Sequence, residues 1–229
     1  MNGTLTNYRV LTHMLTTAQN PARYNLIFLR HGESVGNAEG KHQGQSDFPL
    51  TKKGESQVRA LAERWLQEKM IFDLIISSPL TRARGSAQIL ADALHIPLTY
   101  DPRWMERNNG VLAGLRQDEA IITYPRPSFV NPYLPIGQTG ESQWELYLRA
   151  GSAVQDLLYR PPGAYLIVSH GAILNMALYA ILGITPQANF IGPRFRFANT
   201  AFATLSYNPA EHKWYVHGIN DRQHWQDDE

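Results

Sequence analysis

The sequence predicts an α/β domain of three layers, α/β/α, in which a mostly parallel sheet has helices on both faces. Three short apolar runs support this prediction, at residues 26–29, 73–77 and 164–169. They are too brief for helices, and each precedes a longer segment with apolar residues at helical spacing. Strands that alternate with helices are typical of a parallel sheet, because each crossover helix packs on a face of that sheet.

The first run, residues 26–29, is expected to be a buried strand that ends in Arg30 and His31. Gly32 then allows the backbone to turn sharply. Open α/β sheets bind ligands at the carboxyl ends of their strands, so chemistry is expected here. An Arg-His pair considered alone is more often a polar strand end that faces solvent.

A helix is predicted after the polar loop of residues 33–49, with Thr51 as its N-cap. Its apolar stripe contains Val58, Leu61, Trp65 and Leu66. Gly54 lies in the first turn and is expected to permit close packing rather than to contact a ligand.

The second run, residues 73–77, leads through Ser78 and Pro79 into another predicted helix. The apolar face of that helix contains Ala83, Ala87, Leu90, Ala91 and Leu94. Arg82 falls in the first turn, just beyond a strand end, and Arg84 is expected on the solvated face. Residues 98–100 are predicted to form an edge strand.

Residues 124–140 contain four prolines and three aromatic residues, a density that excludes a regular element. We therefore predict an inserted lid at about residues 116–140. Its aromatic residues are either the loop's own small core or a wall of the substrate site. A helix is expected to return over residues 141–159, with Trp144 and Leu148 among its core-facing positions, and to stop at the Pro-Pro-Gly of residues 161–163.

The third run, residues 164–169, ends at His170 and Gly171, and a helix over residues 172–182 follows, closed by Gly183. Segments 201–207 and 213–219 predict an antiparallel hairpin. Arg194 and Arg196 alternate with two phenylalanines, which suggests one face of a strand. We expect a single domain over residues 25–219, an N-terminal extension of residues 1–24 with a short helix near residues 8–15, and a polar tail of residues 220–229.

Composition excludes several classes of function. The formal net charge of the 229 residues is +1, so bulk charge does not attract a nucleic acid. The chain has no cysteine, which rules out disulfides, thiolate metal sites and a cysteine nucleophile. Neither a signal peptide nor a membrane-spanning run is found in the sequence, and a soluble, cytoplasmic protein is expected.

Three strand ends offer Arg30 with His31, Arg82, and His170. A parallel sheet gathers its strand ends along one edge, so two arginines and two histidines are expected in one concave site. Guanidinium groups match phosphoryl oxygens in a bidentate manner, and the amides that open the helix after Pro79 add to the positive field. The pattern therefore points to a phosphoryl ligand.

The segment LRHGESVGN (29–37) resembles the signature of the histidine phosphatase superfamily, to which the cofactor-dependent phosphoglycerate mutases also belong. Further similar motifs occur in the family's order through most of residues 25–207. They are GQSDFPLTKKGESQ (44–57), SSPLTRARGSA (77–87), MERNNGVLAGL (105–115), GES (140–142) and VSHG (168–171).

The resemblance implies that His31 is a nucleophile that forms a phosphohistidine, with its other ring nitrogen held by a backbone carbonyl. Neighbouring Arg30 and Arg82 are expected to keep the imidazole neutral. The resemblance further implies a metal-free phosphate clamp that needs no cofactor. The implied phosphate-binding residues are Arg30, Asn37, Gln43, Gly44, Arg82, His170 and Gly171.

Glu106 occupies the family's position for the acid that protonates the leaving group. The negative charge of a bound phosphate favours protonation of a neighbouring carboxyl group. Glu33 and Glu141 are alternatives for this role. The six remaining histidines are expected to be surface or hairpin residues without partners: His13, His42, His95, His212, His217 and His224.

The resemblance favours a phosphomonoester hydrolase for a small phosphorylated metabolite, with mutase-type phosphoryl transfer as the alternative. Asn109 and Gln117 stand where the mutases carry a tyrosine and a substrate-binding lysine, and the mutases' double arginine before the lid is absent. A zinc site of His31, His170 and Glu106 is disfavoured, because the arginines would repel a cation. A degenerate phosphate-binding regulatory domain is a further alternative. Expected partners are the substrate and, by analogy with relatives, a second copy in a homodimer.

Overall fold

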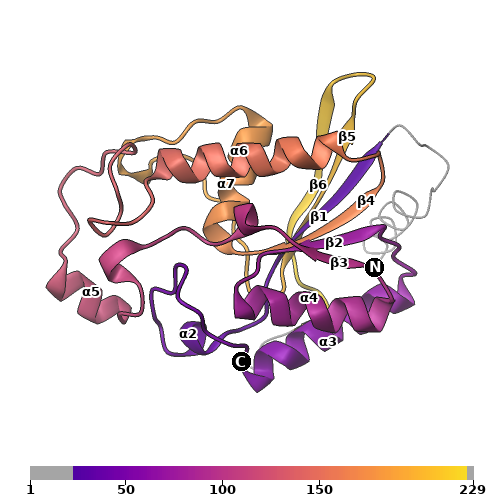
Figure 1. The fold of residues 1–229 in the computed structure, drawn as a ribbon, viewed down its shortest axis with the longest axis horizontal. Helices are drawn as coiled ribbons and strands as arrows, with labels where there is room; N and C mark the ends of the chain where they lie inside the picture. Colours follow the sequence, from indigo (N-terminus) through magenta and orange to yellow (C-terminus); the bar gives the residue numbers. More distant parts are fainter. Residues whose placement is uncertain (1–22, 226–229) are drawn as a thin grey trace, which may run out of the picture.

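Six strands form one sheet, and helices cover both of its faces (Figure 1). The computed structural model describes residues 23–225. The order of strands across the sheet is β3-β2-β4-β1-β5-β6. Their bounds are Tyr24–Arg30 (β1), Leu74–Ser77 (β2), Leu98–Tyr100 (β3), Ala164–Ser169 (β4), Phe202–Asn208 (β5) and Lys213–Asp221 (β6).

The sheet is parallel from β3 through β2 and β4 to β1, and β5 and β6 complete it in antiparallel pairing. This arrangement confirms the predicted α/β/α fold with a mostly parallel sheet. Strand β4 lies between β1 and β2. The carboxyl ends of these three strands are therefore neighbours at one edge of the sheet.

Helices α3 and α4 cover one face of the sheet, and α6 and α7 cover the other (Figure 1). The helix bounds are Val35–Ala38 (α2), Lys52–Gln67 (α3), Thr81–Leu94 (α4), Gln117–Thr123 (α5), Gln143–Tyr159 (α6) and Gly171–Leu182 (α7). Short 3-10 turns lie at Pro102–Trp104 (η1), Gly110–Leu112 (η2) and Ala188–Phe190 (η3).

Strand β1 contributes to both cores because its side chains alternate between the two faces. Ile27 and Leu29 pack with Trp65 beneath α3 and α4, whereas Leu26 and Phe28 lie in the core of α6 and α7. All of these side chains are fully buried. A strand buried on both faces has no polar alternation, which is why its sequence reads as a continuous apolar run.

Helix α6 departs from the expected pattern at two positions. Leu148 is 56% exposed, and Trp144 packs against Tyr133 of the lid at a ring-centroid distance of 5.0 Å. The buried stripe of α6 includes Leu146, Ala150 and Leu157, and residues two positions from Leu146 lie on the other side of the helix, which is why Leu148 faces solvent and Trp144 faces the 124–140 loop. Tyr133 of the lid therefore packs against the first turn of α6.

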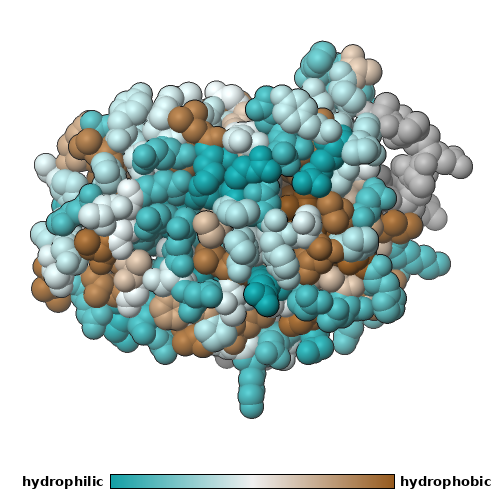
Figure 2. Space-filling view, viewed as in Figure 1, coloured by the Kyte–Doolittle hydropathy of each residue, from teal (hydrophilic) through white to brown (hydrophobic). Residues whose placement is uncertain are grey.

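The lid region contains one helix, α5, which the sequence analysis did not foresee; from Pro125 to Gly140 it has neither helix nor strand. Ile121, Ile122 and Phe129 of the lid are exposed. Figure 2 shows apolar groups at the end of the molecule that carries α5.

Two expectations near the C-terminus were wrong. Residues 194–197 form no strand; Asn175 of α7 holds this segment by hydrogen bonds to both backbone groups of Phe195. Strand β6 runs to Asp221, into the segment expected to be a polar tail, where Asp221 pairs with Phe202 of β5 and its carboxylate is bound in a bidentate manner by Arg64 of α3.

The helix expected near residues 8–15 and the end of the tail lie outside the described residues. Within residues 23–225, none of the helices has the length and apolar character needed to cross a bilayer.

The structure agrees with the expected role of Gly54 in close packing. The hydroxyl of Thr51 caps α3 by accepting from the Gly54 amide at 3.0 Å. A Cβ atom on Gly54 would collide with the carbonyl oxygen of Glu33. Glycine therefore lets α3 begin directly against the chain that follows His31.

We predict that Gly54→Ala lowers the free energy of unfolding by about 1–3 kcal/mol, because the new methyl group forces backbone apart. Gly151→Ala in α6 is the matched control, since its Cβ would meet only the Ala180 methyl group at 3.8 Å. That control is expected to be neutral or to stabilise by up to about 1 kcal/mol. Denaturant unfolding of both variants measures the difference, and equal stabilities would contradict the packing role.

Candidate active site

The three strand ends meet as the sequence predicts. His31 follows β1 and His170 follows β4, and the two ring centroids are 5.0 Å apart. Arg82 enters the same space from the first turn of α4, after β2. All three side chains are buried, with residue exposures of 2% for His31, 0% for His170 and 1% for Arg82.

A hydrogen bond defines the tautomer of His31. Its Nδ1 lies 2.7 Å from the carbonyl oxygen of Gly32. A carbonyl oxygen can only accept, so Nδ1 carries the proton and Nε2 carries the lone pair in the neutral ring. Within residues 23–225, the hydrogen bond to Gly32 is the only one that the His31 ring makes. The predicted backbone acceptor is thus present, and the other nitrogen is left for chemistry.

The surroundings of His31 favour its neutral form. Burial is the largest influence, and the positive charges of Arg30 and Arg82 add to it, so the pKa of the His31 imidazole lies well below its ordinary range. The hydrogen bond to Gly32 acts in the opposite direction but is weaker. The imidazole is therefore in its neutral form near neutral pH, with the lone pair on Nε2 that nucleophilic attack requires.

His170 uses both ring nitrogens within the protein. Its Nδ1 accepts from Nε of Arg82 at 3.2 Å, so its Nε2 carries the proton and donates to the Ser78 hydroxyl at 2.8 Å. Burial and the charge of Arg82 also hold the pKa of His170 well below its usual range. His170 therefore orients the Arg82 guanidinium, and direct contact with a ligand requires one of these two bonds to open.

Arg82 and Arg30 place positive charge in the site, and within residues 23–225 neither forms a direct salt bridge, although the charge of Glu106 acts on both. Arg82 donates to the carbonyl oxygens of Gly44 and Ser46 at 2.6 and 2.9 Å, and Arg30 donates to the carbonyl oxygen of Phe197 at 2.8 Å. Arg30 Nε is buried and lacks a partner within residues 23–225. Burial lowers the pKa of Arg82 to about 10, so its guanidinium stays charged at neutral pH. Unpaired buried charge is costly, so these groups favour an anionic ligand.

The expected phosphate-binding residues on the 34–44 segment divide into two groups. The Asn37 side-chain oxygen accepts from Ser34 and Asn199, which leaves its amide N–H groups directed elsewhere. Gln43 accepts from the Ser34 hydroxyl at 2.6 Å, and Gly44 supplies a carbonyl to Arg82. Gln43 and Gly44 therefore support other site residues, whereas Asn37 keeps donors for a ligand.

Glu106 lies at the amino end of α7, next to Gly171. Its carboxylate accepts from the amides of Ala172 and Ile173 at 3.2 and 3.3 Å. It also lies close enough to raise the pKa of both Arg30 and Arg82 by its charge. Helix α7 thus holds a carboxyl group beside the two guanidinium groups.

Neither alternative to Glu106 is free for acid chemistry. Glu141 is bound in a bidentate manner by Arg149, at 2.8 and 2.6 Å, and Glu33 accepts from the Thr51 hydroxyl at 2.8 Å. The Arg107 guanidinium donates through Nε to Asn109 at 3.1 Å, and it is the Arg107 backbone amide that donates to the Glu106 carboxylate, at 2.9 Å. Of the three carboxyl groups, Glu106 alone acts electrostatically on both site arginines.

Sequence reasoning missed Ser78 and Asn199, which contact His170 and the carbonyl of His31 respectively. The strand-end position of Ser78 was a usable signal, but nothing in the spacing pointed to Asn199. Three histidines were wrongly expected to lack partners: His212 contacts the Tyr207 hydroxyl at 3.3 Å, His217 the Ser206 hydroxyl at 2.8 Å and His224 the Thr200 hydroxyl at 2.9 Å. Burial and the charge of Arg64 lower the pKa of His224 to about 4.

The alternative of a zinc site finds no geometric support. Among residues 23–225, no three His, Cys, Asp or Glu side chains are grouped so that they could hold a metal ion, and this includes His31, His170 and Glu106.

A neutral, buried histidine between charged guanidinium groups, at the strand ends of an α/β/α sheet, defines a protein of the phosphatase and mutase type. The sequence profile of the histidine phosphatase superfamily (branch 1) matches residues 26–222. The chain belongs to this superfamily.

Named relatives include both activities. A probable phosphoglycerate mutase GpmB of Enterobacter sp. (strain 638) is 37% identical, over 84% of this chain and 88% of its own. YhfR of Bacillus stearothermophilus has a similar structure, with a TM-score of 0.73 at 26% identity, covering 88% of this chain and 98% of that one. A mutant phosphoserine phosphatase of Entamoeba histolytica, solved with phosphoserine, has a TM-score of 0.70 at 25% identity, covering 89% and 100%.

The lowered pKa of His31 predicts a pH-dependent stability. In the unfolded chain its pKa returns to about 6.5, so below that pH the unfolded state binds more protons than the folded state. The free energy of unfolding is then expected to fall with decreasing pH, by up to about 1.4 kcal/mol per pH unit for this group.

Denaturant unfolding between pH 7 and 5 tests this expectation. In His31→Asn the free energy of unfolding should fall less between pH 7 and 5 than in the wild type, because the buried imidazole is gone. His95→Asn is the control, since His95 is exposed and its left-handed backbone suits asparagine. If the free energy of unfolding of His31→Asn depended on pH as steeply as that of the wild type, the lowered pKa of His31 would be contradicted.

Proposed function

We propose that this protein is a metal-independent phosphomonoester hydrolase, which acts on a small phosphorylated metabolite through a phosphohistidine at His31. The observation that carries the proposal is the hydrogen bond from Nδ1 of His31 to Gly32, which leaves the Nε2 lone pair beside Arg30 and Arg82. The two guanidinium groups suit the charge of a phosphoryl group.

In the first step, Nε2 of His31 attacks phosphorus and the ester P–O bond breaks. Glu106 gives its proton to the departing oxygen, and Arg30 and Arg82 stabilise the charge on the phosphoryl oxygens. In the second step, water attacks phosphorus as Glu106 takes up a proton. The P–N bond then breaks, which restores His31 and releases inorganic phosphate.

Hydrolase and mutase chemistry share the phosphohistidine and differ in its acceptor. Two positions that bind substrate in the mutases have other contacts here: Asn109 is buried and accepts from Arg107, and Gln117 is exposed at the start of α5. Neither residue has a charged side chain, which a mutase would use to retain its substrate while the phosphohistidine exists. These observations favour water as the acceptor, with mutase activity as the second candidate.

The phosphoenzyme is the decisive test. We expect the wild-type protein to hydrolyse members of a phosphomonoester panel and to form an acid-labile phosphoryl group on His31. His31→Ala should lose both, because His170, the other imidazole of the site, has both ring nitrogens bonded to Arg82 and Ser78. Phosphoester cleavage that persists in His31→Ala would refute the proposal, and isomerisation of 3-phosphoglycerate that outpaces its hydrolysis would favour the mutase.

Glu106→Gln is expected to lower kcat by about 10²–10⁴-fold on alkyl phosphates, whose leaving oxygens need a proton. An activated aryl phosphate should lose much less, because its leaving group departs as a stable anion. Steady-state rates on one substrate of each kind measure the contrast. Equal losses on both would count against Glu106 as the acid.

A further inference from the structure

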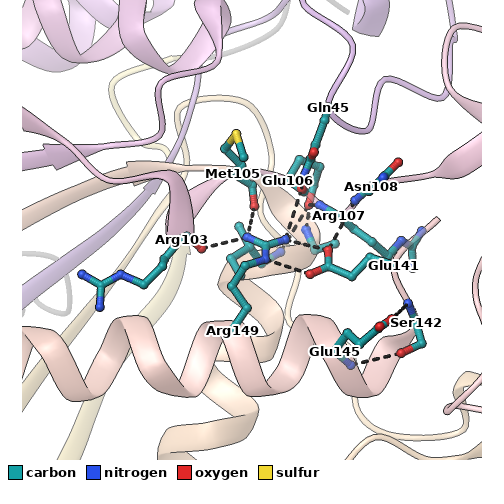
Figure 3. Close-up of polar contacts among 12 residues, drawn as sticks. Gln45, Arg103, Met105, Glu106, Arg107, Asn108, Glu141, Ser142, Glu145 and Arg149 are labelled. Atoms are coloured by element: carbon teal, nitrogen blue, oxygen red, sulfur yellow. Dashed lines mark hydrogen bonds and ion pairs between the residues drawn. The ribbon is translucent and has the colours of Figure 1, made fainter.

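One guanidinium group holds the segment that carries Glu106. Arg149 extends from α6 to this segment (Figure 3). Its Nη1 donates to the carbonyl oxygens of Arg103 and Met105 at 2.8 and 2.6 Å, and its Nη2 donates to that of Glu106 at 3.3 Å. Three carbonyl groups of four consecutive residues therefore converge on one side chain.

The remaining donors of Arg149 bind Glu141. Nε and Nη2 form a bidentate pair with its two carboxylate oxygens, at 2.8 and 2.6 Å. All five N–H groups of the guanidinium can thus be used at once, and the exposed fractions of the Arg149 and Glu141 side chains are only 19% and 14%. Pairing with Glu141 neutralises the charge and determines the plane of the fork.

The held segment has little structure of its own. Residues 105–109 belong to no helix or strand, so their carbonyl groups lack the regular partners that a helix or a sheet provides. Besides Arg149, Gln45 donates to the Glu106 carbonyl at 3.0 Å. The backbone of Glu106 is therefore positioned by side chains from other elements.

The carboxyl group of Glu106 is held from the opposite direction. The amides of Ala172 and Ile173 at the start of α7 donate to its oxygens, as does the Arg107 amide, while Arg149 holds its backbone from α6. The side chain thus spans the distance between two helices that pack together. A shift of the backbone by even a fraction of an ångström would change where the acid meets the leaving oxygen.

We propose that Arg149, oriented by Glu141, is a positioning residue that sets the place of the Glu106 carboxyl group in the reaction. This inference rests on the proposed function of Glu106 as the acid. Lysine cannot replace Arg149, because its three donors have no planar fork with which to bind Glu141 and three carbonyl groups together.

Arg149→Lys and Glu141→Gln test the proposal on a matched pair of substrates, an alkyl phosphate such as glycerol 3-phosphate and 4-nitrophenyl phosphate. Misplacement of a catalytic group by about 1 Å can cost about 10²-fold. We expect kcat on the alkyl phosphate to fall by about 10–100-fold in both variants, with KM nearly unchanged. The aryl phosphate, which hardly needs the acid, should lose less than about threefold.

Arg64→Lys is the matched control. Arg64 also binds a carboxylate in a bidentate manner, that of Asp221, and it lies on α3 rather than against the Glu106 segment. We expect this variant to lose stability while its ratio of alkyl to aryl rates stays at the wild-type value. A purely structural role for Arg149 would give the same result as this control.

A double-mutant cycle with Glu106→Gln separates positioning from general damage. If Arg149 acts through Glu106, adding Arg149→Lys to Glu106→Gln causes no further loss on the alkyl phosphate. Additive losses, or equal losses on both substrates, would overturn the proposal while leaving the phosphatase assignment intact. A wild-type protein that cleaves neither substrate would instead overturn the proposed function itself, and the positioning role with it.

Discussion

The hydrogen bond from Nδ1 of His31 to the carbonyl of Gly32 is the interaction on which the site depends. It determines which ring nitrogen is protonated, and it is formed with the residue next in the chain, so it persists as long as the turn after β1 is intact. That turn is packed against the first turn of α3, where only a glycine fits at position 54. The reactive tautomer is thus tied to the packing of the sheet against its helices.

Charge in the site is arranged on the same scaffold. Arg82 is held by backbone carbonyls and by His170, and Arg30 is held by the carbonyl of Phe197, so within residues 23–225 the direct partners of both guanidinium groups are uncharged. Neutral oxygen acceptors orient a guanidinium without cancelling its field. Arg149 differs, since its guanidinium is paired directly with the Glu141 carboxylate and its other donors bind backbone carbonyls. Arg30 and Arg82 are thus suited to bind an anion, and Arg149 is suited to position the acid.

Much of this architecture was predictable because it rests on local patterns. Thr51 caps α3, Gly183 closes α7 with a positive φ of 69°, and the three apolar runs form β1, β2 and β4. Other positions were misjudged because tertiary context decided them. The apolar character of Leu148 suggested a core position, but the face of α6 that meets the sheet is the one with Leu146 and Ala150. A polar tail sequence likewise does not reveal that β6 pairs with β5 as far as Asp221.

The sequence alone determined the chemical inventory of the site: Arg30 and His31, Arg82 and His170 follow strands, and parallel strands must end at a common edge. Only the tertiary structure decided how these groups are bonded to one another. It brought Ser78 to His170, Asn199 to the carbonyl of His31 and Arg149 to the backbone of Glu106. The reason is physical, since these contacts join residues far apart in the chain, and their geometry depends on how helices and strands pack rather than on any local preference.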